Sequence, residues 1–287
     1  MNTPFPESEL ILNADGSIYH LHLQPEQIAE TIITVGDPDR VQGVSKYFDR
    51  ITDRVQHREF VAHTGELNGK RISVVGTGIG TDNIDIVFNE LDALVNIDFK
   101  TRTVKPSLTE LTIVRVGTSG CLQADIPIDT ILVSEYGLGL DALMDYYEFE
   151  DDAPDVLEAF VANWDEGALP YPYLIGCDKT LLATVGKGLP KGITATCPGF
   201  YAPQGRVLRG RAFMPDLVQR LSDFKYKKHR ITNFEMETAG IYGMAQVLGH
   251  KALSVNALLA NRITHEFSKN AEKTVTQAIE LVLERLA

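Results

Sequence analysis

Cysteines, long apolar runs and a basic leader are scarce or missing in this sequence. The three cysteines, Cys121, Cys177 and Cys197, are scattered and form no CxxC pair, so we expect reduced, buried thiols of a cytoplasmic protein. No apolar run approaches the roughly 20 residues of a membrane-spanning helix, so no membrane partner is expected. Residues 1–7 lack a basic start and an apolar stretch, which argues against a signal peptide.

Lysine and arginine are absent between residues 116 and 178, whereas 14 acidic residues fall there. The whole chain has 39 acidic and 27 basic residues and a net charge of −12, so the remainder, with 39 − 14 = 25 acids, is nearly balanced at 27 − 25 = +2. Because no basic stripe stands out, nucleic-acid binding is not expected. The densest acidic part, residues 141–155, is interpreted as solvated, within an insertion at about 139–175; an acidic interaction surface is the alternative.

What is present is an alternation of strand and helix patterns. Hydrophobic residues make up 44% of the 287 residues, which is enough for a large core. The alternation predicts an α/β fold, a three-layer α/β/α sandwich whose central sheet is largely parallel or mixed, and no linker or repeat divides residues 1–287 into more than one domain. We expect strands at 31–35, 56–67, 71–75, 111–116, 130–134, 192–196 and 252–259, and helices at 84–97, 179–187, 215–224, 235–248 and 269–286.

Two local signals fix details of this pattern. Asn68-Gly69 predicts a tight hairpin turn between two of the strands. After the first strand, Asp37 suits the N-cap of a helix and Pro38 its first position.

Arginines and glycines gather where strands are expected to end. Arg40 follows Gly36 at the first strand, and Arg115 begins the segment Arg115-Val116-Gly117-Thr118-Ser119-Gly120. Ligands of such folds bind beyond the carboxyl ends of the strands, where open backbone and guanidinium groups can hold an anion. Arg58 adds a third candidate. For any single arginine, a surface ion pair remains the alternative.

The segment Asn233-Phe234-Glu235-Met236-Glu237 places two carboxylates two residues apart before an apolar helix. Acids in a first helical turn can simply cap the helix and complement its dipole. The apolar neighbours instead favour a pocket, in which a carboxylate accepts two hydrogen bonds from the paired hydroxyls of a sugar. Both interpretations remain open at this point.

Several familiar motifs are incomplete. Residues 76–81 miss GxGxxG because position 81 is Thr, and residues 117–121 miss GxSxG because position 121 is Cys. His20 and His22 lack a third ligand, so no metal site is expected.

Five segments occur here in the order seen in the nucleoside phosphorylase-I family, which the chain therefore resembles. They are Gly36-Asp37-Pro38-Asp39-Arg40, His57-Arg58-Glu59-Phe60, Thr77-Gly78-Ile79-Gly80, residues 115–120 and Phe234-Glu235-Met236-Glu237. The loop Phe200-Tyr201-Ala202-Pro203-Gln204-Gly205-Arg206 resembles the pyrimidine-reading loop of the uridine-cleaving members. Tyr19-His20-Leu21 resembles a sugar-contacting segment, and Asn261-Arg262 a late loop near the base.

The resemblance implies a central mixed sheet and a role for each matching residue. Phosphate is expected at Gly36, Arg40, Arg58, Arg115 and Thr118; ribose at His20, near the 5′-hydroxyl, and at Glu235, Met236 and Glu237; and the base at Ser119, Gly120, Phe200, Gln204, Gly205, Arg206 and Arg262. Catalysis is assigned to Arg115, Glu237, Gln204 and Arg206. No cofactor is implied, because inorganic phosphate is a co-substrate. In the family, His20 and Arg58 reach the site of a neighbouring subunit, which implies a homodimer or homohexamer.

The expected function is therefore phosphate-dependent cleavage of uridine to uracil and ribose 1-phosphate, in pyrimidine salvage or catabolism. The alternatives are a nucleosidase or purine nucleoside phosphorylase of the same superfamily, or a non-catalytic nucleoside-binding or storage protein. The chain departs from the family at Pro198-Gly199 and at Pro203. It also has Asn83 where some relatives have a serine near a monovalent-cation site, so no such cation is predicted.

Overall fold

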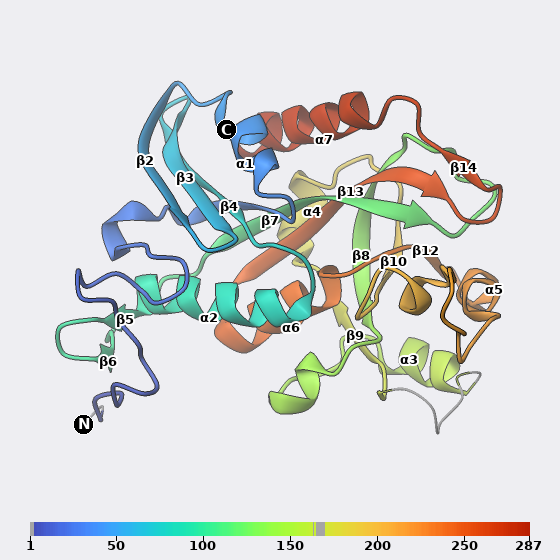
Figure 1. Cartoon of the computed structure of the whole chain (residues 1–287), viewed down its shortest axis with the longest axis horizontal. Helices are drawn as coiled ribbons and strands as arrows, with labels where there is room; N and C mark the ends of the chain where they lie inside the picture. Colours follow the sequence, from blue (N-terminus) through green and yellow to red (C-terminus); the bar gives the residue numbers. More distant parts are fainter. Residues whose placement is uncertain (1–2, 163, 165–169) are drawn as a thin grey trace.

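The computed structural model describes residues 3–162, 164 and 170–287, and one mixed sheet runs through it (Figure 1). The strand order is β11-β12-β10-β8-β13-β7-β1-β4-β3-β2, with β9 paired to β8 and β14 to β13. The strands of this sheet are β1 (Thr31–Val35), β2 (Arg50–His57), β3 (Phe60–Leu67), β4 (Lys70–Gly76), β7 (Thr112–Cys121), β8 (Ile131–Gly139), β9 (Tyr173–Gly176), β10 (Lys191–Thr196), β11 (Lys225–Tyr226), β12 (His229–Glu235), β13 (Lys251–Asn261) and β14 (Glu266–Phe267). A separate small sheet joins β5 (Ile97–Asp98) to β6 (Thr103–Val104).

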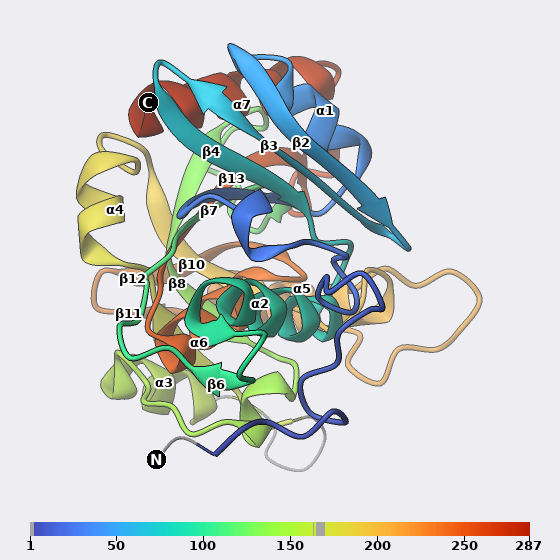
Figure 2. The same ribbon diagram turned by 90° about the vertical axis from the view of Figure 1, so that its left-hand side faces the viewer.

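Helices cover both faces of the sheet (Figures 1 and 2). The α-helices are α1 (Asp39–Ser45), α2 (Thr81–Asn96), α3 (Pro154–Val161), α4 (Lys179–Thr184), α5 (Leu217–Asp223), α6 (Thr238–Leu248) and α7 (Ala271–Leu286), and the 3-10 turns are η1 (Pro25–Gln27), η2 (Leu143–Tyr146) and η3 (Ala202–Gln204). Neighbouring residues of a strand point to opposite faces. Accordingly Ile32 packs in the core of α2 and α6, and Ile33 in the core of α1, α4 and α7. The predicted three-layer α/β fold with a mixed sheet is confirmed.

Part of the sheet closes on itself, because β12 pairs with β7 as well as with β10. Asn233 and Phe234 lie opposite Cys121 and Gly120. A Cβ at Gly120 would lie 2.5 Å from the Phe234 ring, so glycine permits this close approach. The sequence predicts no strand here, because β12 carries polar side chains. Their burial depends on distant partners: Asn233 donates to Ser119 Oγ at 2.7 Å and accepts from Thr194 Oγ1 at 3.0 Å.

The expected element boundaries shift at two places that matter for the site. Helix α1 begins at Asp39 with Pro38 at its N-cap, one residue later than predicted, and Asp37 Oδ1 accepts the Asp39 N–H at 3.0 Å. Helix α6 begins at Thr238, not at Glu235, because Glu235 is the last residue of β12. The hairpin turn at Asn68-Gly69 is confirmed, with φ of 51° and 76°.

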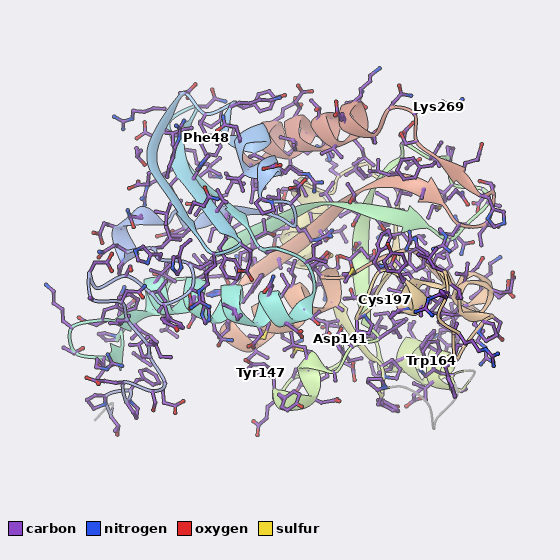
Figure 3. The ribbon with its side chains drawn as sticks, viewed as in Figure 1. Phe48, Asp141, Tyr147, Trp164, Cys197 and Lys269 are labelled. Carbon is purple, nitrogen blue, oxygen red and sulfur yellow. The ribbon has the colours of Figure 1, made fainter. Side chains whose placement is uncertain are left out.

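The solvated interpretation of the acidic stretch is wrong for its first residue. Asp141, labelled in Figure 3, is only 3% exposed and accepts hydrogen bonds from the Leu143 N–H at 2.9 Å and the Tyr173 hydroxyl at 2.9 Å. Burial raises the pKa of this carboxyl above its ordinary value. The expected insertion also supplies β9 and α3, while its residues 163 and 165–169 lie outside the described part.

All three cysteines are free; Cys121 and Cys197 are buried, and Cys177 is half-buried. Within the described ranges, no helix is both long enough and apolar enough to cross a membrane.

Candidate active site

A cavity of about 860 Å³ opens at the carboxyl ends of β1, β7 and β12. This is where ligands of open α/β sheets are expected to bind. Most of the predicted site residues line it together: Gly36, Arg40, Arg115, Thr118, Ser119, Gly120, Phe200, Gln204, Arg206, Glu235, Met236 and Glu237.

Arg115 lies at the floor of the cavity between two carboxylates. Its Nη2 is 2.6 Å from Glu237 Oε2 and 3.0 Å from Glu235 Oε2, and all three side chains are at most 6% exposed. Nη1 donates to Asn256 Oδ1 at 3.0 Å. The side chain passes directly over Gly117, where a Cβ would lie 1.9 Å from Nη1. A glycine at this position is therefore required by the arginine.

Burial and charge oppose each other in this group. Burial on its own lowers the pKa of Arg115, but the Glu235 and Glu237 carboxylates raise it above the ordinary value, so the guanidinium stays charged. Burial raises the pKa of Glu235, against the opposing effect of Arg115. The Arg115 guanidinium thus pairs with two buried carboxylates.

The two acids have different surroundings. Glu235 accepts the backbone N–H groups of Glu237 and Thr238 at 3.1 and 3.0 Å, and the Thr196 hydroxyl at 2.8 Å, so it caps α6. Among the described residues, Glu237 Oε1 accepts only the Gly80 N–H, at 2.9 Å, and Oε2 faces Arg115. A carboxylate has about four acceptor positions. Glu237 therefore keeps capacity for a hydroxyl ligand, whereas the capping interpretation suits Glu235.

Arg40 stands near Arg115 with no carboxylate at ion-pairing distance among the described residues. The one hydrogen bond of its guanidinium to a described residue is long, from Nη1 to the Val116 carbonyl at 3.5 Å. Burial lowers the pKa of Arg40; the Asp37 charge opposes this effect, and the Arg115 charge adds to it. A half-buried guanidinium in this position suits an anion, with the Thr118 hydroxyl and the Gly36 backbone beside it.

The other end of the cavity is formed by the loop around η3. The Arg206 guanidinium lies 3.8 Å from the centre of the Phe200 ring, and its Nη1 donates to Gln204 Oε1 at 2.7 Å. Arg262 donates to the Gln204 carbonyl at 2.8 Å and so holds the loop from β13. Gly205 ends η3 with φ of 65°. Gly205 and Arg262 thus lie behind the lining residues and support them.

This end carries positive charge without a matching acid. No carboxylate of the described residues pairs with Arg206 or Arg262. Burial lowers the pKa of both, and their mutual repulsion lowers the pKa of Arg206 further. A ligand that gains negative charge here is stabilised by groups already in place.

His20 and Arg58 do not line the cavity. His20 lies on the N-terminal segment, where Nδ1 is 2.7 Å from Glu90. Arg58 is exposed at the turn between β2 and β3, with φ of 54°, and its guanidinium lies 5.0 Å from the Tyr19 ring centre. His20 and Arg58 lie in neighbouring segments, because the His57 ring at this turn lies 3.0 Å from the His20 carbonyl.

Several lining residues were not predicted as site residues: Asp37, Pro38, Glu59, Gly78, Ile79, Asn83, Phe234, Leu259, Ala260 and Phe267. Most adjoin a predicted motif and could have been found from it. Ile79 and Phe267 are each 67% exposed, and no pattern in the sequence marks Phe267.

Known proteins share both the sequence and the fold. A family model for the phosphorylase superfamily matches residues 30–287. A uridine phosphorylase of Thermococcus kodakarensis is 32% identical over 98% of this chain and 92% of its own length. A DeoD-type purine nucleoside phosphorylase of Bacillus cereus is 30% identical over 92% of this chain and 97% of its own.

Among solved structures, the chain is similar to a Trypanosoma brucei nucleoside phosphorylase that shows uridine phosphorylase activity. The TM-score is 0.88 at 26% identity, over 97% of this chain and 99% of that one. The resemblance inferred from the sequence motifs is confirmed, and the chain belongs to the phosphorylase superfamily.

Proposed function

We propose that this protein catalyses the phosphate-dependent cleavage of uridine to uracil and ribose 1-phosphate. The observation that carries the proposal is the joining of three sites in one cavity: Arg40 and Arg115 for an anion, Glu237 for hydroxyls, and Arg206 with Gln204 for a polar base. Uridine phosphorylases among the relatives that match nearly the whole chain support this choice.

The charges account for the reaction. Phosphate held by Arg40 and Arg115 attacks C1′ of the ribose while the bond to N1 of uracil breaks, through a sugar cation like that of glycosidases. The phosphate lies beside this cation and stabilises it. The leaving uracil gains negative charge on its carbonyl oxygens, next to Arg206 and Gln204. No covalent intermediate with the protein is required.

A purine nucleoside phosphorylase is the second candidate, because DeoD-type relatives reach 30% identity. A purine leaving group is best protonated by an acid at N7. In this chain the end of β13, Asn256–Asn261, holds no aspartate, and both of its asparagines are committed: Asn256 to Arg115 and Asn261 to backbone carbonyls. This favours a pyrimidine.

The working state belongs to the same proposal. We infer a homodimer or homohexamer in which His20 and Arg58 enter the cavity of a neighbouring subunit. Their position outside the cavity of their own subunit supports this inference. The chain is proposed to act as one domain, in the cytoplasm, with phosphate as co-substrate and no cofactor. The sheet that joins distant parts of the chain supports a single domain, and the free cysteines support the cytoplasm.

Uracil release from uridine should depend on phosphate, because the phosphate proposed to lie at Arg40 and Arg115 is the nucleophile. The measurement compares release in phosphate buffer with release in a phosphate-free buffer of equal ionic strength. Equal rates would identify a nucleosidase. Binding of uridine without turnover in either buffer would identify a binding protein, and faster release of hypoxanthine from inosine a purine enzyme.

Glu237→Gln should weaken catalysis on uridine by about 1.5–3 kcal/mol, the value of a charge-assisted hydrogen bond. Part of this loss comes from the Arg115 contact and is common to all substrates. The part due to the 2′-hydroxyl should vanish with 2′-deoxyuridine, so the loss there should be smaller. Steady-state kinetics on both substrates test this, with Glu135→Gln, on the exposed Lys191 pair, as control. Equal losses would make Glu237 a structural residue only.

A further inference from the structure

Glu90 is a buried acid that does not line the cavity, yet its carboxylate contacts His20, a residue proposed to bind ribose. It lies within α2, is 9% exposed, and faces the N-terminal segment that runs beside this helix (Figures 1 and 2). Its carboxylate accepts the backbone N–H of His20 at 2.8 Å and that of Leu21 at 2.7 Å. The third contact is His20 Nδ1, at 2.7 Å. An acid buried in a helix face is costly unless it is satisfied in this way.

The contact with Glu90 selects one form of the His20 ring. An ionised carboxylate only accepts hydrogen bonds, so Nδ1 must carry the proton. In the neutral ring, Nε2 is then an unprotonated acceptor. No hydrogen bond joins Nε2 to any described residue. The ring orientation is fixed further by the Tyr19 ring, 4.7 Å away edge-on, and by the His57 contact to the His20 carbonyl.

We propose that Glu90 is a positioning residue that presents His20 Nε2 as an acceptor for the 5′-hydroxyl of ribose in the neighbouring subunit's cavity. The inference rests on the proposed function, because it needs a nucleoside substrate and a second copy of the chain. Glu90 touches no substrate. Its effect passes through His20, by fixing both the direction of the ring and the nitrogen that lacks a proton.

The decisive comparison is between uridine and 5′-deoxyuridine. Glu90→Gln leaves one acceptor oxygen for three donors, so its amide faces either Nδ1 or the Leu21 N–H and the selection of the ring form is weakened. The variant should lose on the order of tenfold in kcat/KM on uridine, as when a carboxylate that orients a metal-binding histidine is removed. On 5′-deoxyuridine, which lacks the hydroxyl, the rate should stay within about twofold of wild type. Equal losses on the two substrates would show a structural tie only and overturn the inference.

Two controls separate this role from general damage. Asp92→Asn changes a carboxylate on the same helix that contacts Asn96 and, at 3.4 Å, His250 Nε2, but not the N-terminal segment, so both substrates should be cleaved as by wild type. In a His20→Ala background, Glu90→Gln should cost nothing further on uridine, because coupled residues are not additive. An additional loss there would contradict the inference.

A measurement on the wild-type protein remains decisive if Glu90→Gln fails to fold. Nitrogen-15 NMR of labelled histidines, with His20 assigned by its absence in His20→Ala, should show a protonated Nδ1 and a bare Nε2. The opposite form would overturn the inference. A wild-type enzyme that cleaves no uridine would overturn the proposed function as well, whereas cleavage with equal losses in Glu90→Gln overturns the role of Glu90 alone.

Discussion

Arg115→Ala should abolish phosphorolysis and also destabilise the protein. The activity loss should reach at least about 10²–10³-fold, the effect of removing one preorganised group that stabilises charge in a transition state. Sequence reasoning alone expects the fold to stay largely intact. The structure corrects this, because Arg115 is the cation between buried Glu235 and Glu237. Breaking a buried ion pair by removing one partner costs about 3–5 kcal/mol.

The loss of stability should depend on pH with a definite sign. Burial already raises the pKa of Glu235 above its ordinary 4.5, and removing the guanidinium removes the main opposing effect. A carboxyl whose pKa is higher in the folded than in the unfolded protein contributes stability that is fully present when the pH is below its unfolded pKa. This contribution is lost as the pH rises through its folded pKa. The free energy of unfolding of Arg115→Ala should therefore fall, relative to wild type, as the pH rises above the ordinary 4.5 of the Glu235 carboxyl.

Arg40→Ala is the matched control for this prediction. Arg40 lines the same cavity but pairs with no carboxylate of the described residues, so its loss should impair phosphate use at little cost in stability. Denaturant unfolding and steady-state kinetics of both variants separate the two effects. A stable Arg115→Ala protein with wild-type turnover would remove Arg115 from the proposed site.

Arg206→Ala should act mainly on kcat, with a fall of about 10²–10³-fold. Its guanidinium has no acid partner among the described residues, and the charge that it matches appears on uracil only as the bond to ribose breaks. An interaction made only in the transition state lowers kcat and kcat/KM together when it is lost. KM for uridine should change much less, although the variant also frees the Gln204 amide.

The control lies on the same loop. Arg209 is exposed and does not line the cavity, so Arg209→Ala should keep wild-type kinetics. Cytidine should be a poor substrate of the wild type, because its C4 amino group faces donors and leaves a buried group unpaired. An unaltered kcat in Arg206→Ala, or fast phosphorolysis of inosine, would contradict the assignment of this loop.

The sequence predicts much of the fold because its signals are local. Residues 31–35 form a short β-branched strand, and Asn68-Gly69 a tight turn, in the structure as in the prediction. The residues predicted for phosphate and base that line the cavity follow strand ends or lie in one continuous loop. These features need no knowledge of distant partners.

The remaining features depend on contacts across the chain. Glu235 and Glu237 are equivalent by spacing, yet Glu235 ends a strand beneath the first N–H groups of α6 while Glu237 faces the cavity. Arg115 meets Glu237 122 positions away, which no local pattern encodes. The acidic composition around Asp141 predicts a solvated side chain. In the structure Asp141 is buried beside Tyr173 and accepts a hydrogen bond from the Tyr173 hydroxyl.

The closure of the sheet through β7 and β12 has a kinetic consequence. Ser119 and Asn233, which meet there, are 114 positions apart, so the contact closes a long loop and is expected late in folding. The cavity floor includes Ser119 and Gly120 from β7 and Phe234 and Glu235 from β12. A chain still emerging from the ribosome therefore cannot form the cavity until β12, which ends at Glu235, has been synthesised. Ligand binding during synthesis would thus begin only when most of the polypeptide is present.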